Sequence, residues 1–290
     1  MKKLCFIGGD MRQIRVVNNL SEIFPVIKVY GFSADKKQFS ENVEIYEDIK
    51  DAIIDSDVVI CPLPYSTDGE TINAPFFDKP IYIEDLLKVI KKNELLLVGK
   101  KDSKLEKLTE FYKVRCIDYL EREELAVLNA VPTAEGAIET AMRETPFTLN
   151  GSKVLILGNG RIGKVLAKML CGIGADVTAC VRKYKDAAYC RAMGYGRIFF
   201  SELSEKICEY NVIFNTVPTM VIDESEIKKI KSDAVIIDLA SKPGGVNFKI
   251  TEKYKVKTIW ALSLPGKAAP DTAGDFIAET IINIIRELEV

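Results

Sequence analysis

A glycine-rich turn is predicted after the apolar run Lys153–Leu157, with the sequence Gly158-Asn159-Gly160-Arg161-Ile162-Gly163. The glycines have the spacing G-x-G-x-x-G, and a helical pattern follows them. In such a turn Gly158 permits the tight bend, Gly160 lets the backbone approach a pyrophosphate, and Gly163 lets the helix pack closely on the strand. Because the N–H groups at the start of a helix attract anions, these six residues predict a dinucleotide site. The alternative is a turn whose glycines serve the fold alone.

The choice of dinucleotide depends on the end of the next predicted strand, Asp176–Val181. In an NAD enzyme this strand usually ends near an acidic residue that binds the ribose hydroxyls. Here Arg182 and Lys183 follow the strand instead. Two cations suit the additional 2′-phosphate of NADP, through charge-assisted hydrogen bonds. We therefore predict NADP as the cofactor, with a solvated strand end as the alternative.

Two further segments follow predicted strands in the same half of the chain. Thr216, Val217 and Pro218 come directly after one strand, and Lys242 lies in a stretch rich in Pro and Gly after the next. Because open parallel sheets bind ligands at the carboxyl ends of their strands, we predict that the first three residues contact the cofactor. Ordinary loop chemistry is the alternative for both segments, since Pro and Gly follow many strands.

The sequence contains no histidine. A Ser-His or Cys-His couple is therefore excluded, and so is the usual general base near neutral pH. Acid–base chemistry must depend on Lys, Asp, Glu, Tyr or Cys side chains. The 7 cysteines are scattered and include no C-x-x-C pair, so the sequence predicts neither a disulfide framework nor a metal site.

Charge and hydropathy exclude several classes of protein. The 40 basic and 42 acidic side chains give a net charge of −2, which provides no field for binding nucleic acid. Hydrophobic residues make up 48% of the chain, but no apolar stretch approaches the ~18 residues of a membrane span. Near the N-terminus, glycines and Asp10 interrupt the apolar run before a secretion signal could form. We therefore expect a cytoplasmic protein that binds neither nucleic acid nor membrane.

Short apolar runs alternate with helical stretches in both halves of the chain, which predicts parallel sheets covered by helices. The strands expected in the first half are Leu4–Ile7, Val26–Tyr30, Glu44–Tyr46, Asp57–Cys61, Leu95–Val98 and Val114–Ile117. Those expected in the second half are Lys153–Leu157, Asp176–Val181, Arg197–Phe200, Val212–Asn215, Ala234–Asp238 and Lys257–Trp260. The predicted fold class is α/β, with two Rossmann-like, doubly wound parallel-sheet domains joined by hinge helices.

The domain boundaries follow from where this alternation stops. Between residues 121 and 148 apolar residues at helical spacing predict two helical pieces, broken at Pro132. A last amphipathic helix is predicted over Thr272–Glu287. We therefore expect an N-terminal substrate-side domain over 1–120, hinge helices over 121–148, a Rossmann domain for NADP over 149–270, and a C-terminal helix over 271–290 that can pack back on the first domain.

Four segments together resemble the family of the dipicolinate synthase A subunit: Gly8–Gln13, Asn129–Ala137, the glycine turn Gly158–Gly163, and Leu264–Gly274. The resemblance runs from Leu4 to the final helix. The glycine turn is shared with 2-hydroxy-acid and alanine dehydrogenases, whereas the other three segments are more distinctive.

This resemblance implies an NADP-dependent oxidation of dihydrodipicolinate to dipicolinate. It places the protein in the mother-cell cytoplasm of a sporulating bacterium, where its partner is a flavoprotein-like B subunit. We also expect a homo-oligomer. Two other functions stay open, because many activities share this fold: another NADP-dependent dehydrogenase of an amino, imino or hydroxy acid, and a partner subunit that binds NADP without catalysis.

Without histidine, two substrate carboxylates must be held by Arg, Lys, hydroxyls or backbone amides. Such groups lie at the ends of predicted elements: Arg12, Ser66, Thr133, Lys242, Lys267 and Asp271. We predict that Arg12 and Lys267 contact the carboxylates, and that Ser66 and Thr133 also bind substrate. Lys242, Lys267 and Asp271 are the catalytic candidates, with Lys242 or Asp271 near the transferred proton. The alternatives are solvated cations and helix caps.

Overall fold

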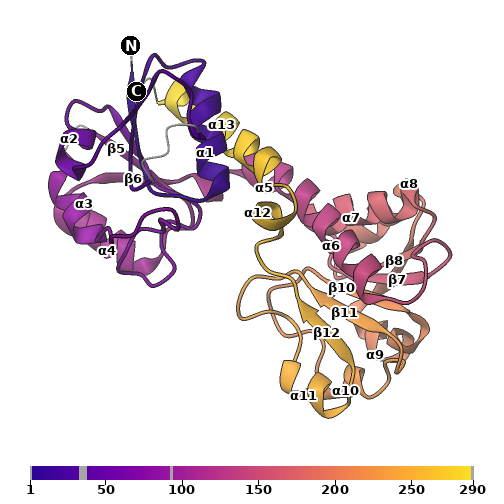
Figure 1. The fold of residues 1–290 in the computed structure, drawn as a ribbon. Helices are drawn as coiled ribbons and strands as arrows, with labels where there is room; N and C mark the ends of the chain where they lie inside the picture. Colours follow the sequence, from indigo (N-terminus) through magenta and orange to yellow (C-terminus); the bar gives the residue numbers. More distant parts are fainter. Residues whose placement is uncertain (1, 33–37, 92–93, 289–290) are drawn as a thin grey trace. The chain divides into compact units, whose positions relative to one another are not determined.

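The computed structural model describes residues 2–32, 38–91 and 94–288. The chain forms two compact units, Met1–Leu128 with Pro270–Val290, and Asn129–Ala269 (Figure 1). The predicted hinge segment is divided between them, because residues 121–128 belong to the first unit and residues 129–148 to the second.

The first unit contains a six-stranded parallel sheet of order β3-β2-β1-β4-β5-β6. Its central strands are continuous apolar runs, as expected where helices cover both faces of a sheet. β1 pairs with both β2 and β4, so the winding direction reverses there. The strands are β1 (Lys3–Ile7), β2 (Val26–Tyr30), β3 (Val43–Ile45), β4 (Val58–Ile60), β5 (Leu95–Val98) and β6 (Arg115–Asp118).

Helices cover both faces of this sheet (Figure 1). On one face α1 and α13 bury aliphatic side chains against Leu4 and Phe6. On the other face α2, α3 and α4 pack around Cys5 and Ile7. The helices of this unit are α1 (Met11–Ser21), α2 (Ile49–Ile53), α3 (Ile83–Val89), α4 (Ser103–Tyr112), α5 (Glu123–Leu128) and α13 (Pro270–Glu287).

The contact between α1 and α13 is close. A Cβ atom on Gly274 would lie 2.7 Å from Arg15 Cβ and 2.8 Å from Arg12 O, so glycine permits this approach. Arg15 Nε donates to Asp275 Oδ1 at 2.6 Å, and Asn19 Nδ2 donates to the same oxygen at 2.7 Å. Residues 270–287 therefore pack into the first unit, although most of that unit is formed by the N-terminal part of the chain.

The second unit contains another six-stranded parallel sheet, of order β12-β11-β10-β7-β8-β9. Its winding direction reverses between β7 and β10, which follows the same rule as the first sheet. The prediction of two doubly wound parallel sheets is confirmed. The strands are β7 (Lys153–Leu157), β8 (Asp176–Val181), β9 (Gly196–Phe199), β10 (Val212–Asn215), β11 (Val235–Asp238) and β12 (Lys257–Trp260).

Helices α6, α7 and α8 pack on one face of the second sheet, and α9, α10 and α11 lie on the other (Figure 1). The helices of this unit are α6 (Ala130–Glu144), α7 (Arg161–Gly172), α8 (Tyr184–Met193), α9 (Leu203–Lys206), α10 (Glu224–Ile227), α11 (Phe248–Lys253) and α12 (Leu264–Ala268).

The predicted helix break at Pro132 is wrong, and the last helix starts two residues before its approximate predicted start. α6 continues through Pro132, which is its third residue. Proline breaks no bond there, because N–H groups in the first turn have no acceptor within the helix. α13 begins at Pro270, two residues before the predicted start, so Asp271 lies inside its first turn and does not cap it. Proline is favoured in the first turn because its φ is already helical.

Candidate functional site

The glycine turn joins β7 to α7. Gly158 has a φ of +96°, and its N–H donates to Cys180 O at 3.0 Å. A Cβ atom on Gly163 would overlap the backbone oxygen of Gly158, so glycine is required where the helix crosses the turn. At Gly160 a Cβ atom would meet no protein atom within 4 Å. Gly160 therefore borders open space at the start of α7.

The N-terminus of α7 is suited to an anion. The first bond within this 12-residue helix runs from Lys164 N–H to Gly160 O at 3.0 Å. The N–H groups of Ile162 and Gly163 precede it and have no acceptor within the helix. No acidic residue lies in the first turn. The open backbone at Gly160 and these N–H groups together fit the pyrophosphate of a dinucleotide.

A buried hydrogen bond anchors the turn. Asn159 is 9% exposed, and its Oδ1 accepts the hydroxyl of Tyr195 at 3.0 Å. Burial raises the pKa of Tyr195, so the hydroxyl keeps its proton and remains the donor. Asn159 Nδ2 is buried and has no acceptor among the described residues. The glycine spacing predicts Asn159 as a cofactor residue but carries no signal for Tyr195, which lies 36 positions away.

Two buried polar residues organise the ends of the neighbouring strands. Asn215 and Asp238 end β10 and β11 and are 0% exposed. Asn215 Nδ2 donates to Asp238 Oδ1 at 2.7 Å, and the N–H groups of Ala240 and Gly245 donate to the same carboxylate, each at 3.0 Å. The segments that begin with these two residues were predicted to lie at this ligand-binding edge, but the contact between Asn215 and Asp238 was not, although a polar residue ending each of two apolar strands is a signal that points to it.

The predicted cofactor residues after β10 are held against β7. Thr216 Oγ1 donates to Leu157 O at 2.8 Å, and Asn215 Oδ1 accepts the N–H of Val217 at 3.1 Å. Val217 is half-buried and Pro218 is exposed. The hydroxyl of Thr216 is thus committed to the sheet, which leaves Val217 and Pro218 as the surface that a ligand can reach.

Arg182 and Lys183 are both exposed at the end of β8. Lys183 is the residue that precedes α8. The guanidinium carbon of Arg182 lies 5.2 Å from the ring centroid of Phe200. Both residues follow β8, as predicted. They lie at the carboxyl edge of the sheet, where the glycine turn follows the neighbouring strand β7.

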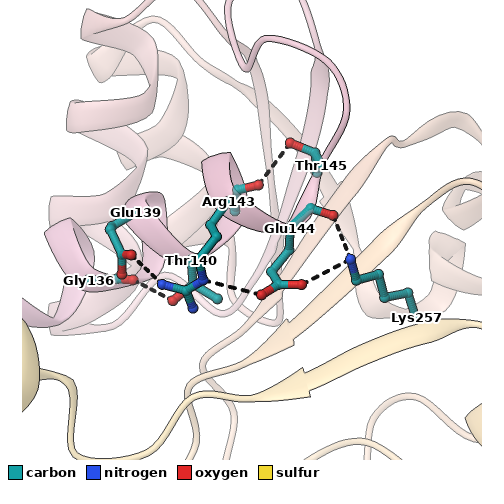
Figure 2. A network of polar contacts seen from close by, with 8 residues as sticks. Gly136, Glu139, Thr140, Arg143, Glu144, Thr145 and Lys257 are labelled. Atoms are coloured by element: carbon teal, nitrogen blue, oxygen red, sulfur yellow. Dashed lines mark hydrogen bonds and ion pairs between the residues drawn. The ribbon is translucent and has the colours of Figure 1, made fainter.

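A hollow of about 620 Å³ lies between α6, the end of β12 and α12 within the second unit. Its lining includes Glu135, Glu139, Arg143, Trp260 and Lys267. Arg143 pairs with Glu139, and its Nε lies 3.3 Å from Glu144 Oε1 (Figure 2). Among the described residues no carboxylate pairs with Lys267. Its charge is therefore the one positive charge of this lining that no acidic side chain of the described residues neutralises.

The same network ties α6 to the edge of the sheet (Figure 2). Lys257 Nζ lies 2.9 Å from Glu144 Oε2 and donates to the backbone oxygen of Glu144 at 2.8 Å. The hydrogen bonds from Lys257 and Arg143 lower the pKa of Glu144, so its carboxylate stays charged near neutral pH. Thr140 and Thr145 turn their hydroxyls back to α6 by donating to the backbone oxygens of Gly136 and Ala141.

Three of the predicted substrate and catalytic residues belong to the first unit. Arg12 is largely buried: it forms an ion pair with Asp10 at 2.6 Å and donates to Leu63 O. Asp10 also caps α1 by accepting the N–H of Arg12 at 3.0 Å. Ser66 Oγ donates to Asp68 Oδ1 at 3.0 Å and accepts the Gly69 N–H, and Asp271 is exposed. The alternative to substrate binding, in which Arg12 is a solvated cation, therefore does not describe its side chain.

The other three belong to the second unit. Thr133 is buried, and its hydroxyl donates to Asn129 O at 2.6 Å. Lys242 is exposed in the loop after β11, and Lys267 is exposed on α12 in the hollow. That Arg12 and Lys267 contact the substrate carboxylates, with Lys242 or Asp271 near the transferred proton, stays a prediction, because these residues are divided between the two units.

Within residues 2–32, 38–91 and 94–288, no helix is long and apolar enough to cross a membrane. Over the same residues, no three His, Cys, Asp or Glu side chains gather in a way that could hold a metal ion.

Two family models match the chain. Residues 3–120 match the N-terminal domain of the dipicolinate synthase A subunit. Residues 129–243 match the NAD binding domain of D-isomer specific 2-hydroxyacid dehydrogenases. The second unit is therefore a nicotinamide-nucleotide-binding unit of the dehydrogenase type, and the chain is an oxidoreductase.

Relatives match over nearly the whole length. The dipicolinate synthase A subunit of Bacillus subtilis (strain 168) is 30% identical over 289 residues, which cover 99% of this chain and 97% of the relative. The crystal structure of the dipicolinate synthase A subunit from Bacillus halodurans has a TM-score of 0.91 at 27% identity, covering 98% and 97% of the two chains. An L-alanine dehydrogenase, at 16% identity and a TM-score of 0.69 over 98% of this chain and 90% of its own, shares the fold. The chain belongs to the family of the dipicolinate synthase A subunit.

Proposed function

We propose that the chain oxidises dihydrodipicolinate to dipicolinate, with NADP as the hydride acceptor. The observation that carries this choice of cofactor is the exposed pair Arg182 and Lys183 at the end of β8, where NAD enzymes usually have an acidic residue. Open space at Gly160 and the N–H groups of Ile162 and Gly163 support a pyrophosphate beside the start of α7.

In the proposed reaction the dihydropyridine ring loses a hydride from one carbon and a proton, and becomes aromatic. NADP supplies the acceptor for the hydride, and a base takes the proton. The chain orients the ring and neutralises two carboxylates. Lys267 supports this role because its charge is not paired with a carboxylate among the described residues and faces the hollow. The proposed second contact is Arg12, whose guanidinium is held by Asp10 and Leu63 O, and Lys242 or Asp271 is the proposed proton acceptor.

By the same proposal the protein acts in the mother-cell cytoplasm of a sporulating bacterium and assembles with a B subunit. The relatives are named as the A subunit of their enzyme, which supports a heteromeric complex. A homo-oligomer of the chain is a further expectation.

The direct test is NADPH formation from enzymatically generated dihydrodipicolinate, followed at 340 nm with and without the B subunit. NADPH should form with the chain present and not without it. Production of NADPH only from other amino, imino or hydroxy acids would contradict the substrate. NADP binding without turnover under either condition would instead identify a binding subunit.

Exchanging Arg182 for aspartate tests the choice of cofactor. Arg182→Asp should raise the Kd of NADP at least about tenfold, because a charge-assisted hydrogen bond worth ~1.5 kcal/mol is replaced by repulsion. The Kd of NAD, which has no 2′-phosphate, should change much less. Isothermal titration with both nucleotides measures this difference. Equal losses for both would show that Arg182 serves only the fold.

A further inference from the structure

Arg182 and Phe200 are brought together by the register of two neighbouring strands. Val181 of β8 pairs with Phe199 of β9, so the residues that follow them lie side by side at the carboxyl edge of the sheet. The Arg182 guanidinium carbon is 5.2 Å from the Phe200 ring centroid, within the range of a cation–π contact. No carboxylate of the described residues pairs with Arg182, so the ring is the partner that the structure gives it.

The Phe200 ring is itself fixed. It is half-buried and packs against the apolar cluster that includes Leu203. Phe200 also begins the short 3-10 turn Phe200–Glu202, which Glu202 closes by accepting the N–H of Phe199 at 2.7 Å. The carboxylate of Glu202 is therefore committed to the backbone. The Phe200 ring is therefore held in place by the apolar cluster against which it packs and by the capped turn that it begins.

We propose that Phe200 is a positioning residue for Arg182 and so a determinant of the preference for a 2′-phosphorylated nucleotide. This inference rests on the proposed use of NADP. An arginine at an exposed strand end has many rotamers, and binding a phosphate must otherwise fix them at an entropic cost. A guanidinium that already rests on a ring keeps its N–H groups available for phosphate oxygens, so less freedom is lost on binding.

The test compares Phe200→Leu with Phe200→Trp in the full chain, by isothermal titration with NADP⁺ and NAD⁺. Phe200→Leu should raise the Kd of NADP⁺ about three- to fivefold, the effect of losing an exposed cation–π contact. The Kd of NAD⁺ should stay within about twofold of the wild-type value, which also reports that the second unit is folded. Phe200→Trp keeps an aromatic face and should retain the preference of the wild type.

The neighbouring strand provides a matched control. The Arg197 guanidinium carbon lies 5.1 Å from the Phe199 ring, in the same kind of contact but two residues before the strand ends. Arg197→Ala should change the Kd of NADP⁺ less than about twofold. In an Arg182→Ala background, Phe200→Leu should have no further effect on the Kd of NADP⁺, because the side chain it positions is absent.

Four outcomes would overturn the inference. Phe200→Leu could raise the Kd of both nucleotides equally, or act with the same size in the Arg182→Ala background; either result would assign the ring to the fold alone. A wild-type chain that prefers NADP⁺, with the preference intact in Phe200→Leu, would overturn the positioning role and leave the proposed function standing. A wild-type chain that prefers NAD⁺ would contradict the proposed cofactor, and the inference with it.

Discussion

Gly160→Val is expected to abolish tight NADP binding while the second unit stays folded. The Kd should rise at least about 100-fold, equivalent to ~2.7 kcal/mol, because the valine side chain would occupy the space through which a pyrophosphate reaches the start of α7. The protein itself should tolerate the change. Gly160 has a φ of −80°, which valine adopts readily, and its Cβ would meet no atom within 4 Å. Isothermal titration and a thermal melt of the ligand-free protein measure the two effects separately.

Gly163→Ala is the matched control in the same turn. Its Cβ would overlap the backbone oxygen of Gly158, so this variant should lower the melting temperature of the ligand-free protein. The two substitutions should therefore have different effects: Gly160→Val should abolish NADP binding, and Gly163→Ala should lower the stability of the protein. If Gly160→Val still bound NADP tightly, the pyrophosphate could not lie over this turn.

Asp238→Ala should lower the free energy of unfolding of the second unit by about 3 kcal/mol. The carboxylate is fully buried and accepts hydrogen bonds from Asn215, Ala240 and Gly245. Removing it leaves buried donors without an acceptor, and each such group costs ~1–3 kcal/mol. Urea denaturation followed by tryptophan fluorescence is a suitable measurement, because Trp260 Nε1 donates to Ala240 O in the loop that Asp238 anchors.

Asp238→Asn separates the hydrogen bonds from the volume of the side chain. It keeps the shape and one acceptor oxygen but places an NH₂ group against a backbone or amide donor, so the loss should be intermediate. A stability of Asp238→Ala within about 0.5 kcal/mol of the wild type would show that the network does not hold the strand ends together.

Much of the fold could be predicted from the sequence because both sheets are parallel and covered on two faces. Such strands are uninterrupted apolar runs, and the ends of β7 and β8 coincide with the predicted ones. Helix boundaries were harder. Proline usually breaks a helix, but its effect depends on its position in that helix. Because α5 ends at Leu128 and α6 begins at Ala130, Pro132 lies in the first turn of α6, where proline is tolerated.

The candidate site also has a part that could be predicted from the sequence and a part that could not. The glycine turn is local, so its spacing and the strand before it were sufficient to predict its conformation. The contact between Arg182 and Phe200 depends on the register of β8 and β9, and the pair Asn215 and Asp238 depends on that of β10 and β11. Register depends on how two separate strands pair, so the apolar pattern of either strand alone does not predict which residues at their ends meet.

The packing of α13 on α1 has a consequence for the order in which the protein folds during synthesis. Ile277, Ile281 and Ile284 belong to the same apolar cluster as Leu4 and Phe6, but they leave the ribosome after the whole of residues 129–269. The second unit can therefore finish folding while one face of the first sheet still lacks α13 and is covered only in part, by α1 and α5. Until α13 is made, the remainder of that face is an exposed apolar surface on a nascent chain, the kind of surface that chaperones bind and that aggregates when left uncovered.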